Sequence, residues 1–385
     1  MRSIYLDNSA STKVYPDVAE LMCKTMLADY GNPSAKHTMG VEAEKYYRES
    51  REEIAETLKV KAKEILFTSG GTESDNMALI GGCFAKMRQG KHIISSAIEH
   101  PAIYKTLEFL ESHGFEISIL PVDEKGHISL TELEKTLRDD TVMVSIMTVN
   151  NEMGAVEDIH AIGELIKKKN PNCLFHTDAI QAYGKMILHP KKDFVDLLSV
   201  SGHKLHGPKG IGFLFIDEKV KINPIIFGGG QQGGLRSGTL NIPGIAGMGL
   251  AAKMVYQDFP KKIEKLYELK DYFIEELEKL PEVKVNSEKG KASAPQIVSA
   301  SFYGVKAEVL LHALEEKGIY VSSGSACSSN HPGISGTLKA IGLTEKALDS
   351  TLRFSFSFLT EKHELNDTIA ALKELLPVLR KFYKA

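Results

Sequence analysis

The chain has 385 residues, of which 43% are hydrophobic and 25% are charged, and this is the ordinary composition of a globular protein. Its formal net charge of -3 produces no strong field that would favour binding to nucleic acid or to an anionic membrane. No apolar run approaches the ~20 residues that a membrane-spanning helix needs. The first residues also lack the apolar core of a signal peptide. We therefore expect a cytoplasmic enzyme with no direct nucleic-acid or membrane partner.

Short apolar runs alternate with helical patterns from about residue 60 to residue 216. The runs predict strands at residues 65–68, 92–95, 116–120, 142–147, 174–176, 197–200 and 211–216. Helical patterns lie between most of them, including residues 129–138 and 159–169. Such alternation is typical of an α/β fold with a mostly parallel sheet covered by helices on both faces. In such sheets, ligands collect at the carboxyl ends of the strands.

A smaller α/β pattern follows a long amphipathic helical stretch at residues 260–280. It predicts strands at residues 283–285, 297–302, 319–322 and 352–356, and a closing helix at residues 361–384. We therefore expect two domains. The larger one comprises residues 14–258, and the smaller α/β domain is formed by residues 1–13 together with 259–385.

The four cysteines do not form a CxxC pair, so neither a zinc site nor a disulfide framework is expected. Cys23, Cys83 and Cys173 stand among apolar or small residues, and this pattern predicts small buried side chains. Cys327 is different because its neighbours are small and polar, as in a loop. This setting favours a reactive, solvent-reached thiol over a structural one.

Residues 199–213 (SVSGHKLHGPKGIGF) contain the most candidate functional residues of any segment. A predicted strand ends there and presents His203 and Lys204. A lysine held close to the sheet is partly buried, and burial lowers its pKa and frees the amine to attack an aldehyde. The alternative is a surface lysine in a basic turn. His203 and His206 could suggest a metal, but they have no acidic or cysteine companion, so no metal is expected.

Three other predicted strands end in polar residues. Asp178 follows a buried strand and could supply the carboxylate that keeps a pyridine nitrogen protonated, or it could cap a helix. Gly70, Gly71 and Thr72 lead from a strand into a helix, an arrangement suited to a phosphate monoester. His100 could stack on a planar ring and relay protons, or cap a helix.

Further motifs extend over nearly the whole chain. They comprise residues 5–12 (YLDNSAST), 31–34 (GNPS), 71–74 (GTES), 99–100 (EH), 149–152 (VNNE), 178–181 (DAIQ), 201–209 (SGHKLHGPK), 228–231 (GGGQ), 235–239 (LRSGT), 322–327 (SSGSAC) and 352–355 (LRFS). In this order and number they resemble the cysteine desulfurases, specifically the bacterial group that supplies sulfur to nitrogenase and to housekeeping iron–sulfur assembly.

The resemblance implies a fold-type I transferase that works as a homodimer and uses pyridoxal 5′-phosphate, held as a Schiff base on Lys204. Asp178 would pair with the pyridine nitrogen, His100 would stack on the ring, and Gln181 would bind the phenolic oxygen. The residues that it implies around the phosphate are Gly71, Thr72, Ser201, His203 and, from the other subunit, Thr239.

The substrate implied by the resemblance is L-cysteine. Asn151 would lie near the ring oxygen and the substrate, and Arg353 would bind the substrate α-carboxylate with a bidentate contact. From the residues alone, Arg353 could equally form a buried structural ion pair. Lys204 would move the α-proton, and the thiolate of Cys327 would take the sulfur as a persulfide, with alanine released. An acceptor protein, either an iron–sulfur scaffold or a tRNA-thiolation enzyme, would then receive the sulfur.

Two alternatives remain open at this stage. The first is a related pyridoxal phosphate enzyme, either an aminotransferase or a selenocysteine lyase. An aminotransferase has no use for a loop thiol. The second is a sulfur-relay adaptor without catalytic activity, which would have no use for a full set of cofactor residues.

Overall fold

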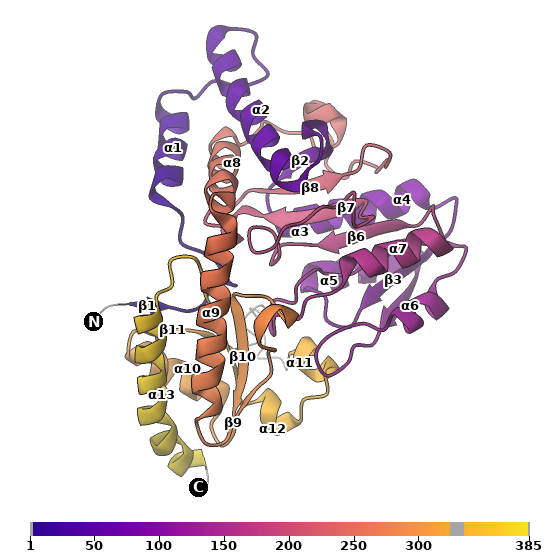
Figure 1. The fold of residues 1–385 in the computed structure, drawn as a ribbon. Helices are drawn as coiled ribbons and strands as arrows, with labels where there is room; N and C mark the ends of the chain where they lie inside the picture. The colour runs from indigo at the N-terminus through magenta and orange to yellow at the C-terminus, as the bar shows by residue number, and fades with distance from the viewer. Residues whose placement is uncertain (1–2, 324–334, 384–385) are drawn as a thin grey trace.

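The computed structural model describes residues 3–323 and 335–383 and is shown in Figure 1. The chain begins with β1 (Ile4–Tyr5), α1 (Pro16–Leu27) and α2 (Thr38–Leu58). The elements of the large sheet and its helices then follow: β2 (Ile65–Thr68), α3 (Gly71–Asn76), α4 (Gly82–Lys86), β3 (His92–Ser96), α5 (Pro101–Ser112), β4 (Glu116–Leu120), α6 (Leu130–Thr136), β5 (Thr141–Ser145), α7 (Ile159–Lys169), β6 (Leu174–Asp178), β7 (Leu197–Ser201), β8 (Gly212–Ile216) and α8 (Ile242–Tyr256). The C-terminal part comprises α9 (Phe259–Glu278), β9 (Val283–Val285), β10 (Ile297–Phe302), α10 (Ala307–Glu316), β11 (Ile319–Tyr320), β12 (Ser322–Ser323), α11 (Gly336–Ala340), α12 (Glu345–Leu348), β13 (Thr351–Ser355) and α13 (Lys362–Tyr383).

The large sheet has the strand order β2-β8-β7-β6-β5-β3-β4. Strand β8 runs antiparallel to both of its neighbours, whereas the other pairs are parallel. The predicted α/β fold class with a mostly parallel sheet is therefore confirmed. Because β2 and β7 both run opposite to β8, the carboxyl ends of β2, β3, β5, β6 and β7 all lie at one edge of the sheet.

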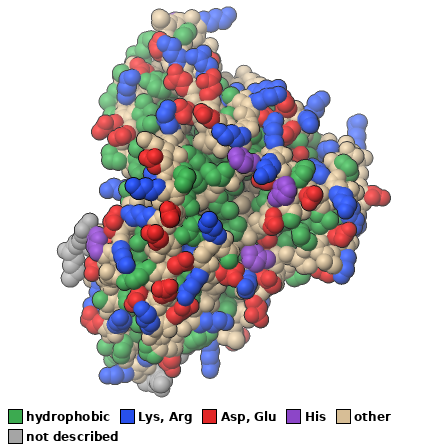
Figure 2. Space-filling model, viewed as in Figure 1, with side chains coloured by type: hydrophobic (Ala, Val, Ile, Leu, Met, Phe, Trp, Pro, Cys, Tyr) green, Lys and Arg blue, Asp and Glu red, His purple; other side chains and the backbone are tan. Residues whose placement is uncertain are grey.

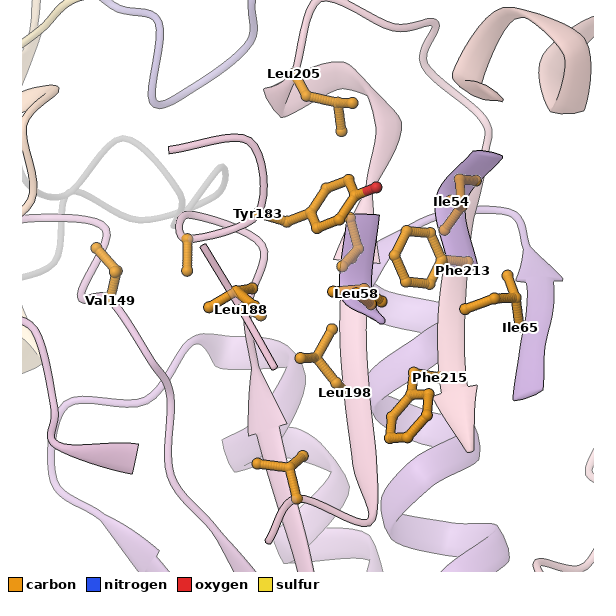
Figure 3. Packing of buried hydrophobic residues seen from close by; sticks show 14 of the residues in the cluster. Ile54, Leu58, Ile65, Val149, Tyr183, Leu188, Leu198, Leu205, Phe213 and Phe215 are labelled. Carbon is orange, nitrogen blue, oxygen red and sulfur yellow. The ribbon is translucent and has the colours of Figure 1, made fainter. Parts of the chain in front are cut away.

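Helices cover both faces of this sheet. Successive side chains of a strand point to opposite faces, so strands whose side chains are all buried must be covered on both sides. Phe213 and Phe215 of β8 join one hydrophobic cluster with Ile54 and Leu58 of α2, and Figure 3 shows these side chains facing one another. Leu214, which lies between the two phenylalanines, belongs instead to the cluster on the opposite face. The sheet therefore has apolar layers on both sides and serves as a rigid support for the loops at its edge.

A smaller antiparallel sheet with the order β12-β13-β10-β9 lies in the C-terminal part, where it packs against α9, α10 and α13 (Figure 1). The prediction of one strand at residues 319–322 was wrong. The segment forms two short strands, because β11 pairs with β1 whereas β12 pairs with β13 of the smaller sheet. The division of the chain into two domains at residue 258 stays a prediction.

The prediction that Cys23 is buried was also wrong, since this side chain is exposed on α1. Val18 and Thr25 are the buried residues of this helix. The neighbouring Met26 and Leu27 are 53% and 75% exposed. α1 carries the apolar side chains that the sequence shows, but several of them face away from the rest of this chain.

Positive and negative side chains are interspersed over the face of the molecule that Figure 2 shows. This mixture agrees with the nearly balanced totals of 47 basic and 50 acidic residues. Among the helices in the described part of the chain, none combines the length and the apolar character needed to cross a membrane.

Candidate active site

A cavity of about 260 Å³ lies at the edge of the large sheet where the strands end. Its walls come from the N-terminal segment, from the loops after five strands and from β13. The residues that line it are Ser9, Ala10, Gly71, Thr72, His100, Met147, Asn151, Asp178, Ile180, Gln181, Ser201, His203, Lys204 and Arg353. Segments that are far apart in the sequence therefore meet at the place that the sheet topology predicts for a ligand.

Lys204 extends from the short 3-10 turn that follows β7 (Gly202–Lys204) and lies half-buried in this wall. Its Nζ atom donates hydrogen bonds to the backbone carbonyl oxygens of Ser9 and Ala10, the latter at 2.9 Å. These acceptors belong to the N-terminal segment, so this segment holds the amine in the cavity rather than in bulk solvent. The alternative of a surface lysine in a basic turn does not describe this side chain.

Asp178 is the last residue of β6, and its carboxyl group is buried at the floor of the cavity. Burial raises the pKa of Asp178 to about 6, although a backbone N–H bond and the charge of Lys204 both act to lower it. The bond comes from the N–H of Ile180, which donates to Oδ1 at 2.8 Å. In its ionised form, which the charge of Lys204 favours, this carboxyl group can hold a proton on a ligand nitrogen.

The end of the cavity near Gly71 and Thr72 carries hydrogen-bond donors and little side-chain bulk. Gly70 has a φ of +154°, which residues with a Cβ atom rarely adopt, so the chain needs glycine at this position. The hydroxyl groups of Thr72 and Ser201 border this space, together with His203. Burial, with smaller contributions from nearby lysine charges, lowers the pKa of His203 to about 4, so its ring is neutral at physiological pH.

His100 is the N-cap residue of α5, and its Nδ1 atom accepts a hydrogen bond from the N–H of Ala102 at 3.1 Å. The ring proton is therefore on Nε2. Burial and the charge of Lys204 lower the pKa of His100 to about 4. Gln181 is fixed in the same wall because its Nε2 atom donates to the carbonyl oxygen of Ser9 at 3.0 Å. His100 thus combines the capping role and the cavity position that the sequence left as alternatives.

Arg353 enters the cavity from the middle strand β13 of the smaller sheet, and its side chain is only 4% exposed. Its Nη1 atom donates to the carbonyl oxygen of Asn151 at 2.8 Å, and its Nη2 atom pairs with Asp7 at 2.8 Å. Arg353 therefore forms the buried ion pair and also lines the cavity, although the sequence had left these as alternatives.

The cavity brings together most of the residues that the sequence singled out, and their individual roles stay predictions. Thr239 does not line it and is exposed in this chain. Cys327 lies outside the described residues. Ser9, Ala10, Met147 and Ile180 line the cavity but had not been singled out. For Ser9, Ala10 and Ile180 the signal was their place in the 5–12 and 178–181 motifs. His206 lies outside the lining, where it stacks on Tyr15.

The residues present fit pyridoxal 5′-phosphate. A ring with a protonated nitrogen needs the buried carboxylate of Asp178, and a phosphate needs hydrogen-bond donors such as the residues Thr72, Ser201 and His203 that line the other end of the cavity. An aldehyde needs an amine within the same cavity, and Lys204 supplies it. One buried hydroxyl, that of Ser9, has no hydrogen-bond partner within the described residues although its residue lines the cavity. A polar ligand would supply that partner.

Comparisons with known proteins point to one family. The sequence profile of the class-V aminotransferases matches residues 4–367. Cysteine desulfurase IscS of Dictyoglomus turgidum is 42% identical over 380 residues, which cover 98% of this chain and 96% of that protein. Cysteine desulfurase IscS of Methanosarcina thermophila is 40% identical, over 98% of this chain and 93% of that protein.

Solved structures agree with the sequence comparisons. A NifS-like protein superimposes with a TM-score of 0.93 at 35% identity, covering 98% of this chain and 100% of that one. The structure of SspA in complex with cysteine gives a TM-score of 0.80 at 34% identity, covering 92% and 99% of the two chains. The chain therefore belongs to the class-V aminotransferase family and, within it, to the cysteine desulfurases.

Proposed function

We propose that this protein removes sulfur from L-cysteine, releases L-alanine and holds the sulfur as a persulfide on Cys327 for transfer to an acceptor. The observation that carries the proposal is the convergence of Lys204, Asp178 and Arg353 on one cavity, although they come from three distant parts of the chain. An amine, a buried carboxylate and a guanidinium group together match an α-amino acid and a pyridoxal cofactor. When bound, pyridoxal 5′-phosphate supplies an aldehyde for the substrate amine and an electron sink for charge at Cα.

Each polar residue of the cavity then has a task. The guanidinium group of Arg353 binds the substrate α-carboxylate, and the side chain of Asn151 borders the same space. Lys204 accepts and returns the α-proton at Nζ. His100, neutral and with its proton on Nε2, would stack on the cofactor ring and could donate toward the substrate. Asp178 holds the proton on the ring nitrogen.

Sulfur transfer needs a thiolate, and three of the four cysteines do not suit this role. Burial raises the pKa of Cys173 to about 12 and that of Cys83 even further, so both stay thiols. Cys23 is exposed, but it lies on α1 and does not line the cavity. Cys327 stands among small polar residues. Its attack on the substrate sulfur forms an S–S bond and breaks the C–S bond, and protonation of the carbon gives alanine.

The protein acts as a homodimer in this proposal. Exposed apolar side chains gather on and near α1 and α2, namely those of Met26, Leu27, Tyr30, Met39 and Val41. Covering this surface with a second copy would remove it from water. Thr239, exposed and outside the cavity of its own chain, would then contact the phosphate of the other subunit.

The sulfur acceptor in this proposal is an iron–sulfur scaffold or a tRNA-thiolation enzyme, and the protein works in the cytoplasm.

The direct test uses the holoenzyme with L-cysteine and a reductant that releases bound sulfur. We expect alanine and sulfide in equal amounts, measured by amino-acid analysis and by a colorimetric sulfide assay, with L-serine giving neither product. Transfer of the amino group to an added 2-keto acid, without sulfide, would instead identify an aminotransferase. Turnover of selenocysteine alone would identify a selenocysteine lyase.

Replacing Asp178 with asparagine is expected to lower kcat for alanine release about 100-fold, because the amide cannot carry the charge that keeps the ring nitrogen protonated. The amide oxygen can still accept from the N–H of Ile180, so local structure is kept. Steady-state kinetics of the holoenzyme measure the effect. The exposed Asp139→Asn substitution is the matched control. A kcat for Asp178→Asn within threefold of the wild-type value would contradict the role of this carboxylate.

A further inference from the structure

The guanidinium group of Arg353 has its nitrogen atoms in three different situations. Nη1 donates to the carbonyl oxygen of Asn151, and Nη2 donates to Oδ1 of Asp7, both at 2.8 Å. Nε is buried and has no hydrogen-bond partner within the part of the chain that the structure describes. A buried N–H group without a partner costs free energy, so this edge of the guanidinium group is suited to a ligand.

Asp7 reaches Arg353 because the N-terminal segment continues beside β13. Asp7 forms a parallel bridge with Ser355, and the N–H of Ser355 donates to the carbonyl oxygen of Leu6 at 2.6 Å. Arg353 lies two residues before Ser355, so their side chains leave the strand on the same face. The Asp7 side chain is 20% exposed, whereas that of Arg353 is 4% exposed. The ion pair thus joins the N-terminal segment to the buried side of the cavity.

We infer that Asp7 is a positioning residue for substrate recognition, a role that rests on the proposed function. Its carboxylate fixes the plane of the Arg353 guanidinium group and occupies one N–H of Nη2. The Nε–H, together with the N–H bonds of Nη1 and Nη2 that Asn151 and Asp7 leave available, is then presented to the substrate α-carboxylate in a fixed orientation. Asp7 also balances the buried charge before substrate enters, since an unpaired buried guanidinium is costly.

Asp7 and Asn151 both hold the guanidinium group of Arg353, and removing Asp7 would affect substrate binding rather than the chemical step. Without Asp7, the carbonyl oxygen of Asn151 would be the one hydrogen-bond acceptor that the described residues still offer the guanidinium group, and the group could then turn about its bonds. The substrate would lose part of its carboxylate binding, but the amine of Lys204 and the carboxylate of Asp178 would be unchanged. The loss therefore falls on KM for L-cysteine and leaves kcat nearly constant.

The first measurement is steady-state kinetics of the holoenzyme with Asp7→Ala, Asp7→Asn and Asp7→Glu. We expect Asp7→Ala to raise KM about 30-fold, in the range for a lost hydrogen bond to a charged group, with kcat within threefold of wild type. Asp7→Asn keeps an acceptor at the same place and is expected to restore most of the affinity. Asp7→Glu displaces the guanidinium group and is expected to behave like Asp7→Ala. Asp367→Ala, an exposed aspartate on α13, is the control.

The second measurement is equilibrium binding to the same holoenzymes by calorimetry. 3-Mercaptopropionate carries the carboxylate and the thiol but no amino group, whereas cysteamine carries the amine and the thiol but no carboxylate. We expect Asp7→Ala to weaken 3-mercaptopropionate binding at least tenfold and to leave cysteamine binding unchanged. Equal binding of 3-mercaptopropionate by wild type and Asp7→Ala, or equal loss of both ligands, would overturn the inference.

These outcomes are separate from those of the proposed function. Absence of alanine and sulfide from the wild-type holoenzyme would refute the proposed function, whatever the Asp7 variants bind. If Asp7→Ala does not fold, the other two variants still test the role of Asp7. Asp7→Asn must then bind 3-mercaptopropionate at least fivefold more tightly than Asp7→Glu. Similar affinities for these two variants would contradict it.

Discussion

Replacing Lys204 with alanine is expected to lower kcat for alanine release about 10⁴-fold, the largest loss of any single substitution in the sheet-edge loops. In the proposed function this variant would lose two roles together: the covalent attachment of the cofactor and the transfer of the α-proton. The Nζ atom of Lys204 is held by the carbonyl oxygens of Ser9 and Ala10, so its position is set by the backbone. No other lysine in residues 3–323 and 335–383 lines the cavity, so none of these can substitute for it.

Two measurements check this result. Steady-state assays give the rate, and mass spectrometry after borohydride reduction shows whether the cofactor is attached, with the adduct expected on a peptide containing Lys204 in the wild type and absent from the variant. Lys192→Ala, at an exposed lysine, is the matched control and should keep both the rate and the adduct. A Lys204→Ala protein that still works within tenfold of the wild-type rate would contradict the assignment.

The strands of the large sheet could be predicted from the sequence because their runs are rich in apolar and β-branched residues, and all of them except the edge strand β4 are buried along their whole length. Strands β2 and β4 have the bounds that their apolar and β-branched runs predicted, and β7 and β8 differ from theirs by one residue. Once the strands and the helices between them were known, the parallel topology followed, and it placed Asp178 and Lys204 at one edge. The position of these residues in the site was therefore predictable from local patterns and general rules.

The N-terminal wall of the cavity could not be predicted in this way. Strand β1 has only two residues, and its partner β11 is more than 300 residues away in the sequence, so no periodic pattern marks the pairing. The contact between Asp7 and Arg353 depends on the bridge between Asp7 and Ser355, which are also more than 300 residues apart. The exposure of Cys23 was missed because an apolar pattern on a helix favours burial of that surface but does not show which of its side chains the rest of the chain contacts.

Replacing Cys327 with alanine is expected to abolish the persulfide and to lower sulfide release at least about 10³-fold, because the variant has no thiolate to attack the substrate sulfur. Cofactor attachment and the binding of L-cysteine should be kept, since Lys204, Asp178 and Arg353 are untouched. The persulfide is measured by alkylation and mass spectrometry of the holoenzyme after one turnover without reductant. The wild type should carry one extra sulfur on the peptide that contains Cys327.

The matched control is Cys23→Ala, which removes the exposed cysteine of α1 and should leave both persulfide and sulfide release unchanged. Cys83 and Cys173 are poor controls, because they are buried in the core and their replacement would leave cavities. Sulfide release by Cys327→Ala at the wild-type rate would show that sulfur leaves the substrate without an enzyme thiol. Loss of the persulfide in Cys23→Ala would instead identify Cys23 on α1 as the nucleophile, although it does not line the cavity that holds Lys204.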